Sequence, residues 1–137
     1  MDRNEPAYRS GQLIAACRLA TGAAGECRWC GAALPARRKT WCSERCSDGF
    51  WNNHWWTLAR RVAKKRDKYR CTRCGHKPLG RSDPRYRKRR ATDRLEVNHI
   101  VAAGGAHRVL SCLHHLDNLE TLCLECHRER TAAQRLV

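Results

Sequence analysis

The chain has 137 residues, and its 28 lysines and arginines against 13 aspartates and glutamates give a formal net charge of +15. This length allows one domain or two very small ones. So large a positive charge favours a polyanionic partner, with nucleic acid ahead of an anionic membrane surface. No apolar run approaches the roughly 20 residues that a transmembrane helix needs. Arg18 interrupts the apolar N-terminal segment, and acidic Asp2 and Glu5 precede it, so we expect no signal peptide and a cytoplasmic protein.

Residues 1–24 predict an arm or one short helix, whereas residues 25–48 predict a compact zinc finger. The finger contains two close cysteine pairs. A disulfide across two intervening residues would close almost no loop, whereas two such pairs around one tetrahedral zinc ion join distant segments. The predicted ligands of this first zinc are Cys27, Cys30, Cys42 and Cys46. Gly31 suits the tight turn after the second ligand, and Ser43 suits the start of a helix at the second pair.

From Ser47 to Lys68 the apolar pattern has a helical period, which predicts one amphipathic helix linking two zinc modules over residues 49–68. Its stripe repeats every four residues, at Phe50, His54, Leu58 and Val62. We expect His54 to be a packed side chain. The neighbouring tryptophans fit core packing or, alternatively, base stacking by an exposed ring. Basic residues off the stripe are candidates for phosphate contacts: Arg60, Arg61, Lys64, Lys65 and Lys68.

The C-terminal part, residues 69–137, begins with a second cysteine pair and a loop rich in proline, glycine and arginine. The segment "LEVNHIVA" predicts a strand and "NLETL" a short return strand, followed by a helix from Leu124 onward. The last cysteine pair then lies where the strand passes into the helix. The predicted ligands of a second zinc are Cys71, Cys74, Cys123 and Cys126.

Two structural zinc ions also fit the energetics of this chain. Only 7% of its residues are aromatic, so the apolar core is small and bound metal would supply much of the folding free energy. The thiolates would then be reduced, as in a cytosolic protein. Cys17 and Cys112 remain outside the close pairs, and we expect no metal role for them.

The segment 69–131 resembles HNH endonucleases of the zinc-containing, ββα-metal type. The resemblance rests on "YRCTRCG", "LEVNHI", "LDNLETLC" and "CHRERT", in that order. The finger "CRWCG…WCSERC" is similar, more loosely, to small fingers that precede such cores in phage and bacterial proteins. The resemblance implies a small, zinc-stabilised α+β fold: a treble-clef-like ββα-metal core, the N-terminal four-cysteine finger and the linking helix.

The same resemblance implies that the chain hydrolyses DNA. His99 matches the general base that activates water, Asn118 matches the residue that orders the loop, and His127 matches a ligand of one catalytic Mg²⁺, Mn²⁺ or other divalent cation. Asn98 matches a second ligand position, where it offers a neutral carbonyl oxygen in place of a carboxylate. The adjacent His114 and His115 are either loop residues near the site or contacts to metal or phosphate.

DNA is the expected partner, and no membrane is expected. Phosphate contacts are predicted for the loop residues Arg87, Lys88, Arg89 and Arg90. The expected location is cytoplasmic, in a bacterial host cell or its nucleoid, and an association with phage packaging or other DNA-processing proteins is left open. The alternative function is a non-catalytic zinc protein that binds nucleic acid or recruits a partner.

Overall fold

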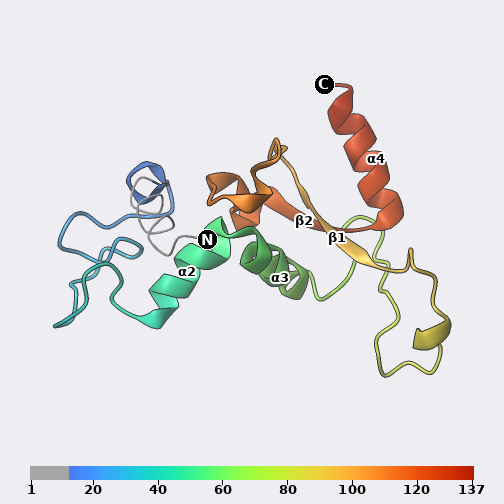
Figure 1. Ribbon diagram of the computed structural model, residues 1–137, viewed down its shortest axis with the longest axis horizontal. Helices are drawn as coiled ribbons and strands as arrows, with labels where there is room; N and C mark the ends of the chain where they lie inside the picture. The colour runs from blue at the N-terminus through green and yellow to red at the C-terminus, as the bar shows by residue number, and fades with distance from the viewer. Residues whose placement is uncertain (1–12) are drawn as a thin grey trace. The chain divides into compact units, whose positions relative to one another are not determined.

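The computed structural model describes residues 13–137, which form a small α+β protein (Figure 1). Its contacts divide into two units. The first unit consists of the chain up to Ala59 together with Ala103–His115, and the second consists of Arg60–Ala102 and Leu116–Val137. Within the described residues, every helix is too short or too polar to span a bilayer. Part of the predicted arm, residues 1–12, lies outside the described residues.

In the first unit, helix α2 (Glu44–His54) follows the N-terminal finger. The hydroxyl of Ser43 accepts a hydrogen bond from the backbone N–H of Cys46, which confirms the predicted helix start at the second cysteine pair. Phe50 is fully buried and stacks on His54 with ring centroids 4.3 Å apart. The ring centroids of Trp41 and Trp51 lie 5.1 and 5.3 Å from that of Phe50, which is the packing arrangement expected for these aromatic side chains.

The prediction of one continuous helix over residues 49–68 is wrong. Helix α2 ends at His54, Trp55 has an extended conformation (φ −103°, ψ 117°), and a second helix, α3, covers Trp56–Arg66. In a continuous helix the carbonyl of His54 would accept from Leu58. Here it accepts instead from the backbone N–H of Ser111 at 3.1 Å, and the N–H of Leu58 bonds to Trp55. The break therefore depends on a segment that is distant in the sequence, which helical periodicity cannot reveal.

The second unit is built on a hairpin of two antiparallel strands, β1 (Leu95–His99) and β2 (Leu119–Cys123), followed directly by helix α4 (Leu124–Arg135) (Figure 1). The register pairs Leu95 with Cys123 and His99 with Leu119. The predicted strand, return strand and C-terminal helix are thereby confirmed. A buried cluster holds the base of the hairpin, and it contains Cys71, Leu95, Leu122, Cys123 and Cys126.

The segment before the hairpin is irregular, as its proline, glycine and arginine content predicts. One 3-10 turn, Tyr86–Lys88, interrupts it. The guanidinium of Arg89 lies 4.0 Å from the centre of the Tyr86 ring, a cation–π contact that orders part of the loop. Most side chains of residues 77–94 are exposed, so their charges face solvent.

Candidate functional site

Two groups of four cysteines have the ligand arrangement of a zinc site, and both are the groups that the sequence predicts. In each, the four Sγ atoms lie within 4.8 Å of one another. Measured Sγ–Sγ distances are 3.6 Å for Cys30–Cys42 and 3.7 Å for Cys74–Cys123. Tetrahedral Zn–S bonds of about 2.3 Å place neighbouring sulfur atoms at about this separation. Both groups can therefore hold zinc without rearrangement.

Each cysteine knuckle turns on a glycine with positive φ. Gly31 (φ +78°) donates its N–H to the carbonyl of Cys27 at 2.8 Å, and Gly75 (φ +79°) donates to Cys71 at 2.9 Å. Only glycine adopts this conformation without strain. The turn also points backbone N–H groups at the first sulfur of each pair, such as that of Cys74 at the Sγ of Cys71.

The thiol pKa values show why each group needs a cation. Burial alone would raise the pKa of Cys27 and of Cys71, but hydrogen bonds from surrounding backbone N–H groups lower both to about 6. Burial, reinforced by the neighbouring thiol of Cys42, raises the pKa of Cys46 to about 12. One thiolate thus forms readily in the finger, and a bound metal ion would favour deprotonation of the other thiols.

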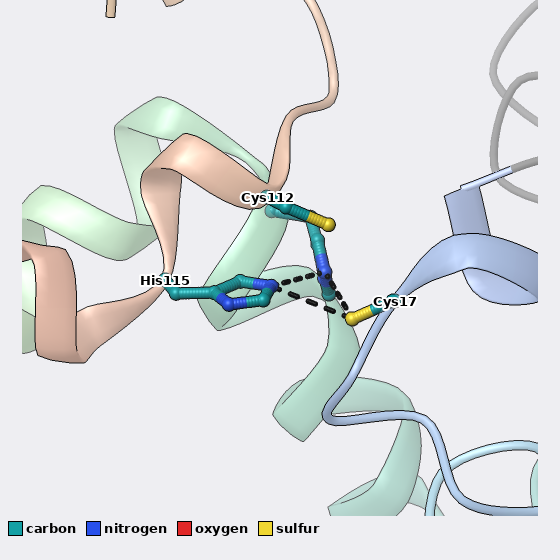
Figure 2. Close-up of side chains that lie close together, drawn as sticks. Cys17, Cys112 and His115 are labelled. Atoms are coloured by element: carbon teal, nitrogen blue, oxygen red, sulfur yellow. Dashed lines mark hydrogen bonds between the residues drawn. The ribbon is translucent and has the colours of Figure 1, made fainter. Parts of the chain in front are cut away.

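A third group of potential metal ligands lies in the first unit: Cys17, His54, Cys112 and His115. Figure 2 shows the side chains of Cys17, Cys112 and His115 converging on one point. Burial lowers the pKa of His54 to about 4, so its imidazole is neutral at pH 7. His54 is packed against Phe50, as expected, but it also belongs with Cys17 and Cys112 to a group that could hold a metal ion, although no metal role was expected for either cysteine. Residues 13–137 thus contain three ligand groups that could hold zinc, where the sequence predicts two.

The sequence signal for this third group was weak because its members do not form close pairs. Only Cys112 and His115 stand three residues apart, and Cys17 and His54 belong to other segments. His115 thus belongs to a possible metal site in the first unit. Its neighbour His114 is fully buried, with its ring centroid 5.5 Å from that of Trp56.

Strand β1 presents Asn98 and His99 to opposite faces of the hairpin, because side chains alternate along a strand. Both residues are buried, each with 6% of its surface exposed. Asn98 shares its face with Glu96 and with Glu120, its partner in the register. The backbone carbonyl of His99 accepts a hydrogen bond from the side chain of Gln134 on α4 at 2.8 Å. The end of β1 is thus fixed to the helix.

Asn118 holds the chain where it leaves β1. Its Oδ1 accepts from the backbone N–H of Val101 at 2.8 Å, and its Nδ2 donates to the carbonyl of Val101 at 3.1 Å. Its own carbonyl accepts from the N–H of Ile100 at 2.8 Å. These three bonds fix the backbone immediately after His99. They are consistent with the loop-ordering role expected for Asn118.

Helix α4 carries His127 to the face of the hairpin that holds Glu96. The Nδ1 atom of His127 lies 2.6 Å from a carboxylate oxygen of Glu96. Asn98 has a different partner: its Nδ2 donates to Glu120 at 2.9 Å, and Glu120 also pairs with Arg130 at 3.0 Å. Sequence reasoning missed Glu96 and Glu120. The spacing of Glu96 and Asn98, two residues apart on one strand, is the signal that would have placed them together.

This face offers the donor types of a hard divalent cation, but not a complete ligand set. Carboxylate oxygens, an amide oxygen and an imidazole are present, and the first two kinds suit Mg²⁺ or Mn²⁺. Among the described residues, however, no group of three Cys, His, Asp or Glu ligand atoms within 4.8 Å occurs here. His127 is paired with Glu96 rather than with Asn98. The donors fit a cation in kind, and substrate or water oxygens would have to complete its coordination.

The basic residues predicted to contact phosphate are largely exposed. On α3 and just after it, Arg60, Arg61, Lys65 and Lys68 are exposed and Lys64 is half-buried. The loop residues Arg87, Lys88, Arg89 and Arg90 are exposed. Three of these, Lys88, Arg89 and Arg90, line a groove of about 1170 Å³ in the second unit, beside the second zinc group. The same groove also receives Lys77 and Arg128, as well as acidic Asp93, Glu125 and Glu129.

Comparisons with known proteins give no match: no family model fits the chain, and no curated protein or solved structure is similar to it at a significant level.

Proposed function

We propose that this protein is a metal-dependent endonuclease of the HNH type, which hydrolyses phosphodiester bonds in DNA through the β1–β2–α4 hairpin unit. The observation that carries the proposal is the position of Asn118. Its amide holds both backbone groups of Val101, directly after the strand that ends in His99. The resemblance of the sequence to HNH endonucleases assigns that same ordering role to Asn118 and the role of base to His99.

In this proposal His99 accepts the proton from the attacking water. A neutral imidazole is suited to that step at pH 7, because its ordinary pKa lies near 6.5. The strand, the bonds from Asn118 and the bond from Gln134 to the carbonyl of His99 hold the backbone of the base. A base held in this way loses little conformational entropy when the substrate binds.

His127 and Glu96 are the residues that would hold the catalytic cation, with Asn98 on the same face of the hairpin. When bound there, a divalent cation would supply positive charge that stabilises the pentacoordinate transition state and the leaving 3′ oxygen. Before metal binds, Glu96 orients the ring of His127 through the 2.6 Å contact. Burial alone would raise the pKa of Glu96, but Arg94 and His127 lower it, so its carboxylate is ionised and available as a ligand.

The basic groove and the exposed face of α3 would hold the DNA backbone. Contacts from lysine and arginine to phosphates release condensed counterions and give affinity without base recognition. The net charge of +15 supports a nucleic-acid partner for the same reason.

The test is nicking of supercoiled plasmid by the zinc-loaded chain in the presence of Mg²⁺ or Mn²⁺. We expect the wild type to convert supercoiled plasmid to open-circular or linear DNA. His99→Ala should slow this conversion by about 100-fold or more, the range typical for loss of a general base. His107→Ala is the matched control, since it removes an exposed histidine of the first unit, and it should retain wild-type activity.

A wild-type protein that binds DNA but leaves the plasmid intact with every divalent metal would contradict the nuclease proposal. Two observations favour this second function, a non-catalytic zinc protein that binds DNA. Asn98 is already engaged by Glu120, and His127 by Glu96, so the two expected cation ligands have separate partners. Side-chain alternation along β1 also directs His99 away from the face that carries Glu96 and His127.

A further inference from the structure

We propose that Cys17, His54, Cys112 and His115 bind a third structural zinc ion, which fastens residues 103–115 to helix α2. The proposal is independent of the nuclease function, because it concerns the first unit and is measured by metal content. It adds a centre with two cysteine and two histidine ligands to the two four-cysteine groups that the sequence predicts.

The four side chains come from three segments that are far apart in the sequence. Cys17 follows a helical turn at residues 13–16, and His54 is the last residue of α2. Cys112 begins the 3-10 turn Cys112–His114 and His115 directly follows it, and the hydroxyl of Ser111 caps the start of the turn. Within the first unit, this turn packs against α2. A shared ion at this point would cross-link all three segments, as structural zinc does in small domains.

The distances within the group are similar to those of a tetrahedral site or slightly shorter. All four ligand atoms lie within 4.8 Å of one another. The Sγ of Cys17 is 3.2 Å from Nε2 of His54 and 3.4 Å from Nε2 of His115 (Figure 2). Bond lengths of about 2.3 Å to sulfur and about 2.0 Å to nitrogen give ligand-to-ligand edges of about 3.3 to 3.8 Å. The four-cysteine finger shows the same kind of spacing, with the Sγ atoms of Cys42 and Cys46 3.6 Å apart.

The tautomer of His54 directs a lone pair into the centre of the group. Its Nδ1 lies 2.6 Å from the carbonyl oxygen of Phe50, and since a carbonyl can only accept, Nδ1 carries the proton. The Nε2 atom of the neutral ring is therefore an acceptor facing Cys17 and His115. Metal-bound histidines characteristically donate their other ring nitrogen to a backbone carbonyl in this way.

The burial of the group also favours a bound cation. His54 is fully buried, and His115 and Cys17 are 3% and 5% exposed. The Nε2 atoms of His54 and His115 stand 2.9 Å apart. At that distance the two nitrogens either share a proton donated by His115 or coordinate one cation, since His54 carries its proton on Nδ1. A zinc ion would accept the facing nitrogen and sulfur lone pairs together.

The first test counts zinc in the full chain, purified without chelator, by elemental analysis and native mass spectrometry. We expect three zinc ions per wild-type chain. Cys112→Ser and His115→Ala should each bind two. The matched control His107→Ala, a histidine of the same unit outside the group, should keep three. A wild-type content of two would overturn the proposal.

Cobalt substitution tests the ligand types directly. Two of the three equivalents should show the strong thiolate charge-transfer absorption of centres with four sulfur ligands. The third should show weaker charge transfer and d–d bands at shorter wavelength, as two nitrogens replace two sulfurs. Cys112→Ser should remove that third component and leave the other two. A titration that saturates at two all-sulfur centres would contradict the proposal.

A third measurement needs no variant, which matters if Cys112→Ser or His115→Ala fails to fold. In native wild-type protein, Cys17 and Cys112 should resist alkylation to the same degree as the eight cysteines of the two four-cysteine groups. Both should react once a chelator removes the zinc. Prompt alkylation of Cys112 before chelation would refute metal binding. So would a Cys17–Cys112 disulfide, detected as a mass loss of two hydrogens that a reductant reverses.

Discussion

At the scale of single residues, Asn98 is the position where the chain differs from an ideal divalent-cation site. Its amide donates to Glu120, which Arg130 also contacts, so protein groups already engage the amide nitrogen of Asn98. An amide suits this position because its nitrogen donates a hydrogen bond, whereas a carboxylate there would face the carboxylate of Glu120. Asn98 thus stabilises the hairpin without metal and offers the metal only a neutral oxygen.

Asn98→Asp should therefore bind Mn²⁺ about tenfold more tightly than the wild type, since a second carboxylate beside Glu120 gains most when a divalent cation separates the two charges. The measurement is calorimetric titration of Mn²⁺ into zinc-loaded protein, with and without DNA. Asn98→Ala, which adds no charge, serves as the control and should bind no more tightly than the wild type. Equal Mn²⁺ affinity in all three proteins would place residue 98 outside the coordination sphere.

At the scale of elements, the end of helix α3 is joined to strand β2 by two adjacent charged residues. Arg66 donates to the carbonyls of Leu116 and Leu119 at 2.5 and 2.7 Å, and its guanidinium pairs with Asp67 at 2.8 Å. Asp67, only 9% exposed, also accepts from the backbone N–H of Thr121 at 3.2 Å. Helix and strand are therefore connected through charge-assisted hydrogen bonds, which are stronger than neutral ones.

Asp67→Asn should lower the free energy of unfolding of the zinc-loaded protein by about 1.5 kcal/mol, the usual contribution of a hydrogen bond to a charged group. Urea unfolding followed by tryptophan fluorescence measures this difference. Asp48→Asn, at an exposed position on α2, is the control and should change the value by less than about 0.5 kcal/mol.

The pH dependence of this difference follows from the pKa of Asp67. Burial alone would raise that pKa, but hydrogen bonds from Arg66 and Thr121 lower it below its usual value of 3.8. A lowered pKa contributes stability that is complete above the unfolded-state value and is lost only as pH falls through the folded-state value. The deficit of Asp67→Asn should hence stay constant from about pH 8 down to about pH 5. A deficit that disappears within this range would show that Asp67 is not held as a carboxylate.

At the scale of the whole molecule, the chain combines a large positive charge with a small core. Its net charge of +15 opposes compaction, and its fully buried side chains are few. Groups of cysteine and histidine that can hold zinc occur in both units of the described chain. Metal binding would compensate for the small core, because its free energy adds directly to that of folding.

The same charge should make DNA binding strongly dependent on salt. Replacing Lys88, Arg89 and Arg90 together by glutamine should reduce the slope of log affinity against log salt concentration by roughly 2 to 3, since each lost phosphate contact removes about 0.9. Fluorescence anisotropy over a salt series measures the slope. Arg85→Gln is the control in the same loop: Asp83 already pairs with Arg85 at 3.0 Å, so the slope should change by less than one. An unchanged slope in the triple variant would remove this loop from the DNA interface.

The sequence by itself determined the local features of this protein. The strand at Leu95–His99, the return strand, the helix from Leu124 and the two four-cysteine groups all follow from periodicity and close cysteine spacing, because each depends on neighbours within a few residues or on a recognisable pair. Asn118 could be assigned a loop-ordering role, and its bonds to Val101 agree with it. The assignment of nuclease roles to His99 and His127 stays a prediction.

Only the tertiary structure decided which distant residues meet when no close cysteine pair marks them. The break after His54, the pairing of His127 with Glu96, and the convergence of Cys17 with His115 each join segments separated by tens of residues. Apolar residues that recur every four positions form the same pattern whether one helix continues or stops. An isolated cysteine has no partner at a short, fixed spacing that would mark it as a ligand. Contacts of this kind depend on how the elements pack, so they leave no local pattern in the chain.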